Sequence, residues 1–170
     1  MRTLCFCDEE RFDMEINMEK SVYAQKAMDL FKEGFNCSQS VFLAFADMYE
    51  MDYKTALRLS SSFGGGMGRL REVCGAVSGM FMVAGILYGY DNPKDYEAKK
   101  AHYERIQQLA KEFEAENGSI VCRKLLGLGE GKDVPAPEKR TDEYYKKRPC
   151  AELVGMAAAI LEQYIKDNSQ

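Results

Sequence analysis

The sequence predicts an all-α fold, a compact bundle of about six to seven helices around a buried central helix at residues 70–89. Apolar residues recur at helical spacing in most segments, and the alternating β-branched runs that predict strands are missing. Residues 70–89 are apolar nearly all round, which is typical of a helix that other helices surround.

The first half of the chain predicts three helices with recognisable ends. The first begins near Met18 and ends at Gly34, since glycine readily adopts the left-handed conformation that closes a helix. Asn36 is a good N-cap for the second helix, and Gln39 stands in the capping-box position three residues later. Asp52 can cap the third helix, which continues until a glycine run stops it.

The predicted central helix follows an unusual stretch of small residues. Three glycines, residues 64–66, precede it, and we expect the helix to start around residues 70–73 and to run to Gly89. Its beginning carries the string Cys-Gly-Ala-Val-Ser-Gly at residues 74–79, a face almost without side chains. Something packs tightly against that face or binds there, and a close-packed seam alone would need no chemistry.

The second half predicts three further helices and one long loop. An Asn-Pro step at Asn92 starts the longest helix, which ends at Gly118, and Ser119 can cap a short helix. Residues 127–143 form a loop that is long enough to cover a site. A last helix opens at Cys150.

Length and charge limit the class of protein. The 170 residues fit a single all-α domain over residues 18–167, preceded by a flexible extension at residues 1–17. The formal net charge is -4 and no basic stripe is present, so we expect no nucleic-acid partner. No apolar run reaches the roughly 20 residues of a membrane span, and no signal peptide opens the sequence, so we expect a cytoplasmic protein.

Six cysteines in a cytoplasmic chain favour metal ligation or redox chemistry, because a reducing compartment keeps permanent disulfides from forming. The sequence contains one histidine, His102, which we expect to be a solvated residue on the longest helix. The sequence therefore offers few ligands for a zinc site of cysteines and histidines, and histidine-dependent catalysis would have to rest on this one residue. Cys5 and Cys7 lie in the expected flexible extension.

Four of the cysteines each fall within about the first turn of a predicted helix. The first turn presents unpaired N–H groups and the positive end of the helix dipole, so we expect thiolates there, with pKa values below the ordinary ~8.5. Arginine and lysine neighbours strengthen this expectation at three of them. The four are Cys37, Cys74, Cys122 and Cys150.

The four cysteines are far apart in the sequence. No C-x-x-C occurs, so the local signature of a zinc ribbon or a bacterial-type ferredoxin is missing. A shared site would have to be assembled by the fold, and four separately buried, inert cysteines are the competing interpretation. A conventional hydrolase or transferase is the least supported class, because no phosphate loop, nucleophile elbow or histidine pair is present.

These residues also resemble a known family. Cys37, the CGAxxG string that begins at Cys74, Cys122 and Cys150 are similar to the pattern of the C_GCAxxG_C_C family, and the likeness covers roughly residues 18–164. The resemblance implies an all-α cytosolic protein whose four shared cysteines are redox-active. Similar domains occur joined to c-type haem electron-transfer modules, which suggests an iron–sulfur site. Covalent haem is not expected here, since no C-x-x-C-H occurs.

We therefore expect the four cysteines to form one redox-active cluster, which ligates a [2Fe-2S] or other metal centre or cycles between dithiols and disulfides. In a metal centre, Gly75 and Gly79 would allow the backbone to approach closely. The charge of Arg71 or Arg148 would tune the site from beside the ligands. A non-redox module for structural zinc or a soft metal such as copper(I) and an inert helical interaction protein stay open as alternatives. We expect a redox protein as partner, and a homodimer that shares the site is a further alternative.

Overall fold

The computed structural model describes residues 16–130 and 133–169, and this part of the chain is all-α, as the sequence predicts. It contains no strand, although Val73 and Val121 form an isolated antiparallel bridge. Cys5, Cys7 and nearly all of the expected flexible extension lie outside the described residues. Within these residues, the helices are α1 (Val22–Lys32), α2 (Cys37–Ala44), α3 (Tyr53–Ser61), α4 (Gly64–Met67), α5 (Gly75–Tyr88), α6 (Tyr96–Asn117), α7 (Cys122–Leu125), α8 (Asp142–Lys147) and α9 (Cys150–Asn168), with short 3-10 turns at Met18–Lys20 and Ala46–Met48.

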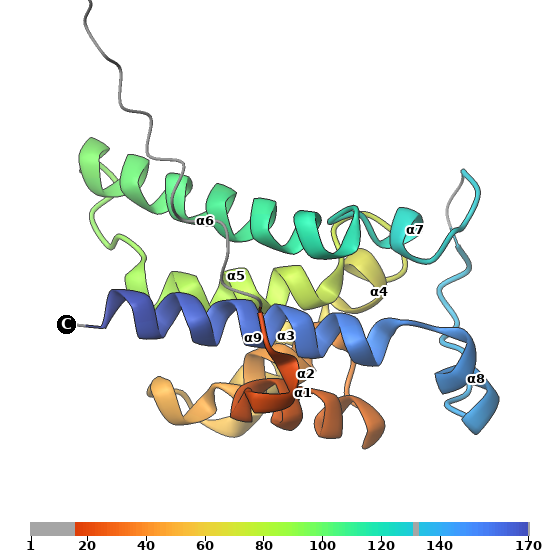
Figure 1. Ribbon diagram of the computed structural model, residues 1–170. Helices are drawn as coiled ribbons and strands as arrows, with labels where there is room; N and C mark the ends of the chain where they lie inside the picture. Colours follow the sequence, from red (N-terminus) through yellow and green to blue (C-terminus); the bar gives the residue numbers. More distant parts are fainter. Residues whose placement is uncertain (1–15, 131–132, 170) are drawn as a thin grey trace, which may run out of the picture.

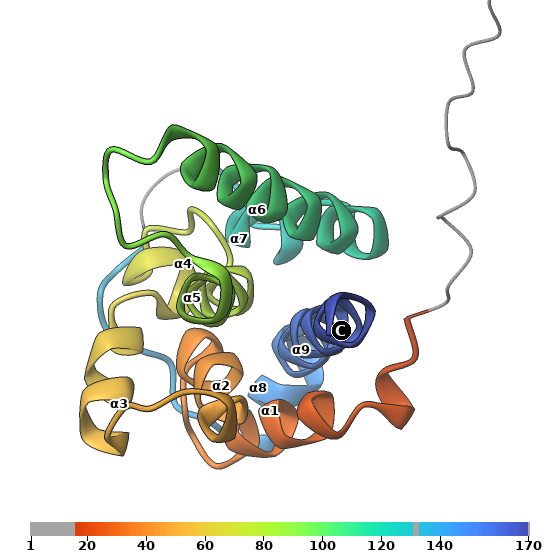
Figure 2. The same ribbon diagram turned by 90° about the vertical axis from the view of Figure 1, so that its left-hand side faces the viewer.

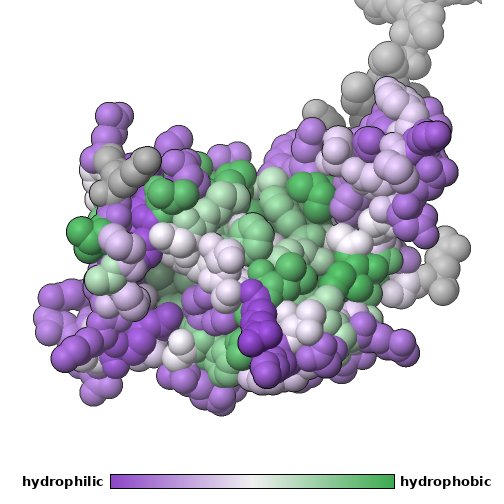
Figure 3. Space-filling model, turned by 180° about the vertical axis from the view of Figure 1, so that it is seen from behind, coloured by the Kyte–Doolittle hydropathy of each residue, from purple (hydrophilic) through white to green (hydrophobic). Residues whose placement is uncertain are grey.

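Helix α5 lies at the centre and packs against α2, α6 and α9, while α1 packs across α2 and α9 (Figures 1 and 2). Val77, Met80 and Val83 of α5 are fully buried, as predicted for a central helix. One side of α5 is less covered: Ile86 is 42% exposed, and hydrophobic side chains gather across the middle of the back face (Figure 3). None of the helices in the described ranges is both long and apolar enough to cross a membrane.

The predicted helix caps are confirmed at several positions. Asn36 and Gln39 form the full capping box at the start of α2. The Asp52 side chain accepts a hydrogen bond from the Thr55 N–H and caps α3. Gly118 ends α6 in the left-handed conformation, with a φ of 82°. Local side-chain chemistry therefore sets these boundaries, and it could be recognised from the sequence.

Several boundaries differ from the prediction. Helix α1 begins at Val22 after a Ser21 cap and not near Met18, and Val121, not Ser119, is the N-cap of α7. Helix α5 begins at Gly75, because Val73 pairs with Val121 in the isolated bridge and Arg71 has a left-handed backbone. Helix α6 begins at Tyr96 after an Asp95 cap, and the side chain of Asn92 closes a turn instead. Helix α8 lies in the region that the prediction left between the long loop and the last helix. Pairing with a distant residue and the choice between two nearby candidate caps cannot be predicted from local sequence.

The small-residue face of α5 is a packing seam against the start of α2. A Cβ at Gly75 would lie 2.8 Å from the Phe63 carbonyl oxygen and 3.0 Å from the Cys37 Cβ. A Cβ at Gly79 would lie 2.7 Å from the Ser38 carbonyl oxygen. Since real Cβ atoms do not approach so closely, only glycine allows the two helix starts to meet, and this contact brings the two cysteine-bearing helix starts together.

Candidate functional site

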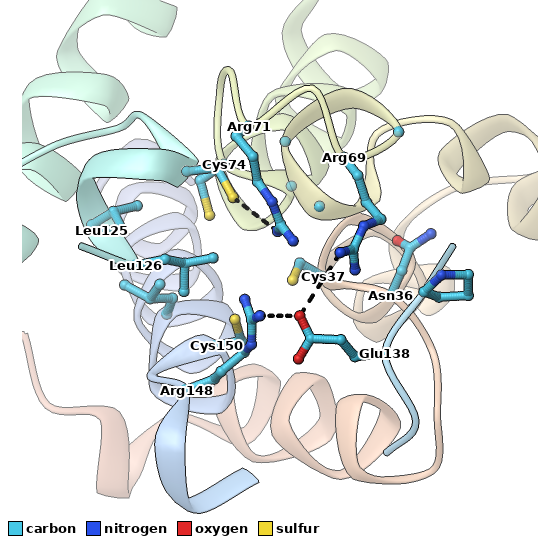
Figure 4. Close-up of a pocket in the computed structure, with 18 of the residues that line it drawn as sticks. Asn36, Cys37, Arg69, Arg71, Cys74, Leu125, Leu126, Glu138, Arg148 and Cys150 are labelled. Atoms are coloured by element: carbon cyan, nitrogen blue, oxygen red, sulfur yellow. Dashed lines mark hydrogen bonds and ion pairs between the residues drawn. The ribbon is translucent and has the colours of Figure 1, made fainter. Parts of the chain in front are cut away.

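All four cysteines singled out in the sequence line one cavity of about 260 Å³ (Figure 4). Its walls come from the starts of α2, α5 and α9, the α4–α5 segment and α7, and residues 135–148 cover it. The loop expected to cover a site therefore does contribute to its wall. The described lining residues include four cysteines, Cys37, Cys74, Cys122 and Cys150, and four arginines, Arg69, Arg71, Arg140 and Arg148.

The cysteines occupy helix starts, as predicted. Three of them, Cys37, Cys122 and Cys150, are the first residues of α2, α7 and α9, and Cys74 is the N-cap of α5. All four are free thiols. By their contacts they fall into two pairs, which we call the α2–α9 pair (Cys37 and Cys150) and the α5–α7 pair (Cys74 and Cys122).

The α2–α9 pair is linked by its electrostatics. The neighbouring Cys37 side chain, together with burial, raises the pKa of the Cys150 thiol. Cys37 is half-buried, whereas Cys150 is only 7% exposed. Cys150 is therefore protonated at neutral pH, and the more exposed Cys37 is the accessible sulfur.

The α5–α7 pair is held by the backbone. The Cys74 N–H donates to the Ile120 carbonyl at 2.8 Å, and the Cys122 N–H donates to the Glu72 carbonyl at 2.6 Å. Burial raises the pKa of the Cys74 thiol to about 12. Burial also raises the pKa of Cys122, although Nη1 of Arg71 lies 3.8 Å from its Sγ and favours the thiolate.

The expectation that helix starts would lower these pKa values is therefore wrong for Cys74, Cys122 and Cys150. At Cys74 and Cys122 the main cause is burial, because removing a thiolate from water costs more than the helix start and the arginines return. At Cys150 the Cys37 side chain is the first cause and burial the second. The sequence showed that these cysteines lie in first turns, but it did not show their burial, which raises the pKa.

The segment before α5 has an unusual backbone. Arg69 and Arg71 have φ angles of 69° and 62°, in the left-handed region that non-glycine residues rarely adopt. Gly66 also has a φ of 66°, and a Cβ there would lie 2.6 Å from the Cys122 Cβ. This strained segment lets the chain pass close to Cys122 and carries both arginines to the cavity wall (Figure 4).

Two carboxylates hold arginines of the cavity in place. Asp133 accepts hydrogen bonds from Arg71 at 2.5 and 3.0 Å and from Arg69 at 2.8 Å, and the Arg71 contact is the main cause that lowers the pKa of Asp133 to about 2. Glu138 pairs with Arg148 and lies 3.8 Å from Arg69 (Figure 4). The carboxylates thus fix the guanidinium groups and neutralise part of their charge.

The fourth guanidinium is held without a carboxylate partner in the described contacts. Arg140 donates to the carbonyl oxygens of Phe31 and Phe35 at 3.3 and 3.2 Å. Its guanidinium lies 4.2 Å from the centre of the Phe31 ring and 4.9 Å from that of Tyr144. Sequence reasoning did not assign Arg140, Glu138 or Asp133 to the site, and the only signal for them was the length of the loop.

The remaining predicted residues have mixed outcomes. Arg71, Arg148 and Gly75 line the cavity, whereas Gly79 does not and instead packs against α2. His102, expected to be solvated, is half-buried on α6, with Nδ1 3.3 Å from Nη1 of Arg105. Burial and the Arg105 charge lower its pKa. His102 does not line the cysteine cavity.

A single metal ion does not fit the site as the chain is folded. Among residues 16–130 and 133–169, no three cysteine, histidine or acidic side chains come together closely enough to hold one ion. Structural zinc sites need four such ligands on one centre. The four sulfurs surround a cavity instead, in two pairs.

A comparison with protein families bears on this cavity. A family model described as "Putative redox-active protein (C_GCAxxG_C_C)" matches residues 35–164, which is more than half of the chain and includes all four cavity cysteines. No curated protein and no solved structure matches the chain.

Proposed function

The chain belongs to the C_GCAxxG_C_C family, and from this premise we propose that it is a thiol–disulfide redox protein whose reactive pair is Cys37 and Cys150. The observation that carries the proposal is that the half-buried Cys37 and the buried Cys150 line the same arginine-lined cavity, where the Cys37 side chain acts on the thiol of Cys150. A disulfide between them requires their two Cα atoms to lie within about 7 Å of each other.

The difference in exposure gives the two sulfurs different roles. Cys37, the accessible sulfur, attacks the oxidant and forms a covalent adduct or mixed disulfide. Cys150 then loses its proton and attacks the Cys37 sulfur, which closes the disulfide and releases the reduced product. Arg148 and Arg140 favour the thiolate of Cys150 at that step. Overall, two thiols lose two electrons and two protons to the acceptor.

An iron–sulfur centre is the second candidate, and one observation favours it. All four cysteines line the same cavity in two pairs, and a [2Fe-2S] cluster takes two thiolates on each iron. Cys37, Cys74, Cys122 and Cys150 would hold it, and it would supply one-electron transfer. The surrounding arginines would offset the charge of four thiolates.

Anaerobic purification followed by iron and sulfide assays, a visible spectrum and thiol counting distinguishes the two candidates. For a dithiol protein we expect a colourless, metal-free sample that loses two thiols reversibly on oxidation. Mass spectrometry should then map the disulfide to Cys37 and Cys150. Cys150→Ser should abolish it, and Cys74→Ser should leave it intact.

The other outcomes are equally definite. Iron with sulfide-type absorption that disappears in Cys74→Ser would replace the dithiol proposal with the cluster. A metal-free protein without reversible thiol loss would contradict both candidates and favour an inert helical interaction protein.

A further inference from the structure

The cavity carries more positive charge than its own acids neutralise. Of the described residues at this site, four are arginines, whereas Glu138 and Asp133 are the two carboxylates that contact them. Two guanidinium charges therefore remain without a matching carboxylate. Formation of a disulfide between Cys37 and Cys150 does not itself require this excess positive charge.

The thiols do not use the excess charge in the reduced protein. Cys74, Cys122 and Cys150 are buried, and their pKa values are raised, so they stay neutral at physiological pH. Arg71 lies against Cys122 without making it a thiolate under these conditions. The positive charge is thus available to something that enters the cavity.

The guanidinium groups are built into the wall and are not loose surface charges. Arg71 is 5% exposed, and the side chains of Arg69 and Arg148 are 15% and 17% exposed. Two of these arginines stand on left-handed backbone, which costs energy and persists only where the surrounding structure imposes it. The planar fork of arginine matches carboxylate and tetrahedral oxyanions, and burial strengthens that interaction.

We propose that this cavity recognises the oxyanion group of a small substrate, and that the substrate is a low-molecular-weight disulfide bearing a carboxylate or a similar anionic group. The anion would lie against the arginines beside Cys37. This inference rests on the proposed thiol–disulfide function and names the substrate class for that same site. A cavity of about 260 Å³ suits a small molecule.

The reaction balances without a further reagent. The Cys37 sulfur, as thiolate, attacks one sulfur of R–S–S–R, the S–S bond breaks, and R–S⁻ leaves and takes up the proton that Cys37 released. Cys150 then gives up its proton and attacks the Cys37 mixed disulfide, and the second R–S⁻ leaves and is protonated. The substrate is reduced to two thiols, and the protein is oxidised to one disulfide.

Three disulfides of different charge test the proposal: dithiodiglycolate, an anion; 2-hydroxyethyl disulfide, which is neutral; and cystamine, a cation. Because their leaving thiols differ in pKa, each rate constant is divided by that for the reaction of the same disulfide with 2-mercaptoethanol. The measurement is the second-order rate constant for oxidation of the reduced, full-length protein at low ionic strength. We expect the anion to react about tenfold faster than the neutral compound, and the cation more slowly than both. High salt should reduce the preference.

A pair of variants separates charge from damage to the fold. Arg148→Gln and Glu138→Gln break the same ion pair but change the charge of the cavity in opposite directions. We expect Arg148→Gln to lower the preference for the anion about threefold and Glu138→Gln to raise it by a similar factor. Arg58→Gln, on the exposed face of α3, is the surface control and should change nothing. Equal rate constants for the three disulfides, or a shift in the same direction in both variants, would overturn the proposal.

A second measurement keeps this inference apart from the proposed redox function. Sulfate should raise the melting temperature of the reduced protein above that in chloride of equal ionic strength by more in the wild type than in Arg148→Gln, because the general stabilising effect of sulfate is common to both proteins. Such Arg148-dependent stabilisation without any reaction of Cys37 and Cys150 would leave an anion site and remove the disulfide chemistry. Disulfide formation with neither charge preference nor sulfate stabilisation would keep the redox function and reject the anion site.

Discussion

The α2–α9 pair and the α5–α7 pair contain the same residue type at the same position in a helix, yet they are held differently. The Cys37 side chain acts on the pKa of the Cys150 thiol, and Cys37 is half-buried. Cys74 and Cys122 are held by backbone hydrogen bonds between their segments, and both are buried. The contrast teaches that a helix start positions a cysteine, whereas exposure and contact decide what its sulfur can do.

The largest expected difference between the pairs is in alkylation rate. At pH 8 a thiol with a pKa of about 12 is ionised in only ~1 molecule in 10⁴, so Cys74 should react with iodoacetamide more than about a hundredfold more slowly than Cys37. Peptide mapping after timed quenching of the native, reduced protein measures both rates. In denaturant the two cysteines should react alike. Equal alkylation rates in the native protein would show that the two sulfurs do not differ in reactivity.

Alkaline pH should reveal the neutral state of Cys74. The folded pKa of about 12 lies above the unfolded value near 9.0, so the folded state retains a proton that the unfolded state loses as the pH rises. The contribution is complete below about pH 9 and is lost as the pH approaches 12. Relative to Cys74→Ala, the wild-type free energy of unfolding should fall by on the order of 4 kcal/mol over this range. Urea titrations at several pH values measure it, and parallel curves for the two proteins would contradict a buried neutral thiol.

A glycine pair tests the seam that joins the two cysteine pairs. Gly75→Ala places a methyl group 2.8 Å from the Phe63 carbonyl and 3.0 Å from the Cys37 Cβ, so we expect a loss of about 2 to 3 kcal/mol. Gly85→Ala on the same helix meets nothing within 4 Å and should stabilise the protein by about 0.5 to 1 kcal/mol. Chemical denaturation compares them, and similar values for both would show that the seam is not close-packed.

The smallest effect concerns the cap that positions Cys37. Asn36→Ala removes the capping box and should cost about 1 kcal/mol. Because Cys37 follows this cap directly, its alkylation rate should also change. Asp52→Ala removes the equivalent cap from α3, which carries no cysteine, and should lower stability while leaving the alkylation of Cys37 unchanged. If both variants changed the alkylation rate of Cys37 equally, the cap at Asn36 would not control that rate.

The sequence was informative where chemistry is local. The caps at Asn36 and Asp52, the glycine end of α6 and the four cysteines at helix starts could all be read from short patterns. The family resemblance is confirmed over residues 35–164. That the fold would bring the four cysteines to one cavity was a hypothesis from the sequence, since no short motif connects them.

The sequence was uninformative where the outcome depends on burial or distant pairing. The first-turn rule predicted lowered thiol pKa values, but desolvation in the packed interior reverses the direction at Cys74 and Cys122, and the Cys37 side chain together with burial reverses it at Cys150. Asp133 and Glu138 contact arginines that are distant in sequence, apart from Arg148. The left-handed conformation of Arg69 and Arg71 depends on the whole fold, because isolated arginines do not favour it.

The distance along the chain between Cys37 and Cys150 couples the oxidation state to the stability of the fold. A disulfide between them closes a loop of more than ~100 residues, which in the chain-entropy account stabilises the folded protein by roughly 5 kcal/mol. By thermodynamic linkage, folding then stabilises the disulfide by the same amount relative to the unfolded chain. For a two-electron couple this makes the reduction potential of the folded protein about 100 mV more negative. The folded bundle would thus make the dithiol of Cys37 and Cys150 a stronger electron donor than the same two cysteines in the unfolded chain.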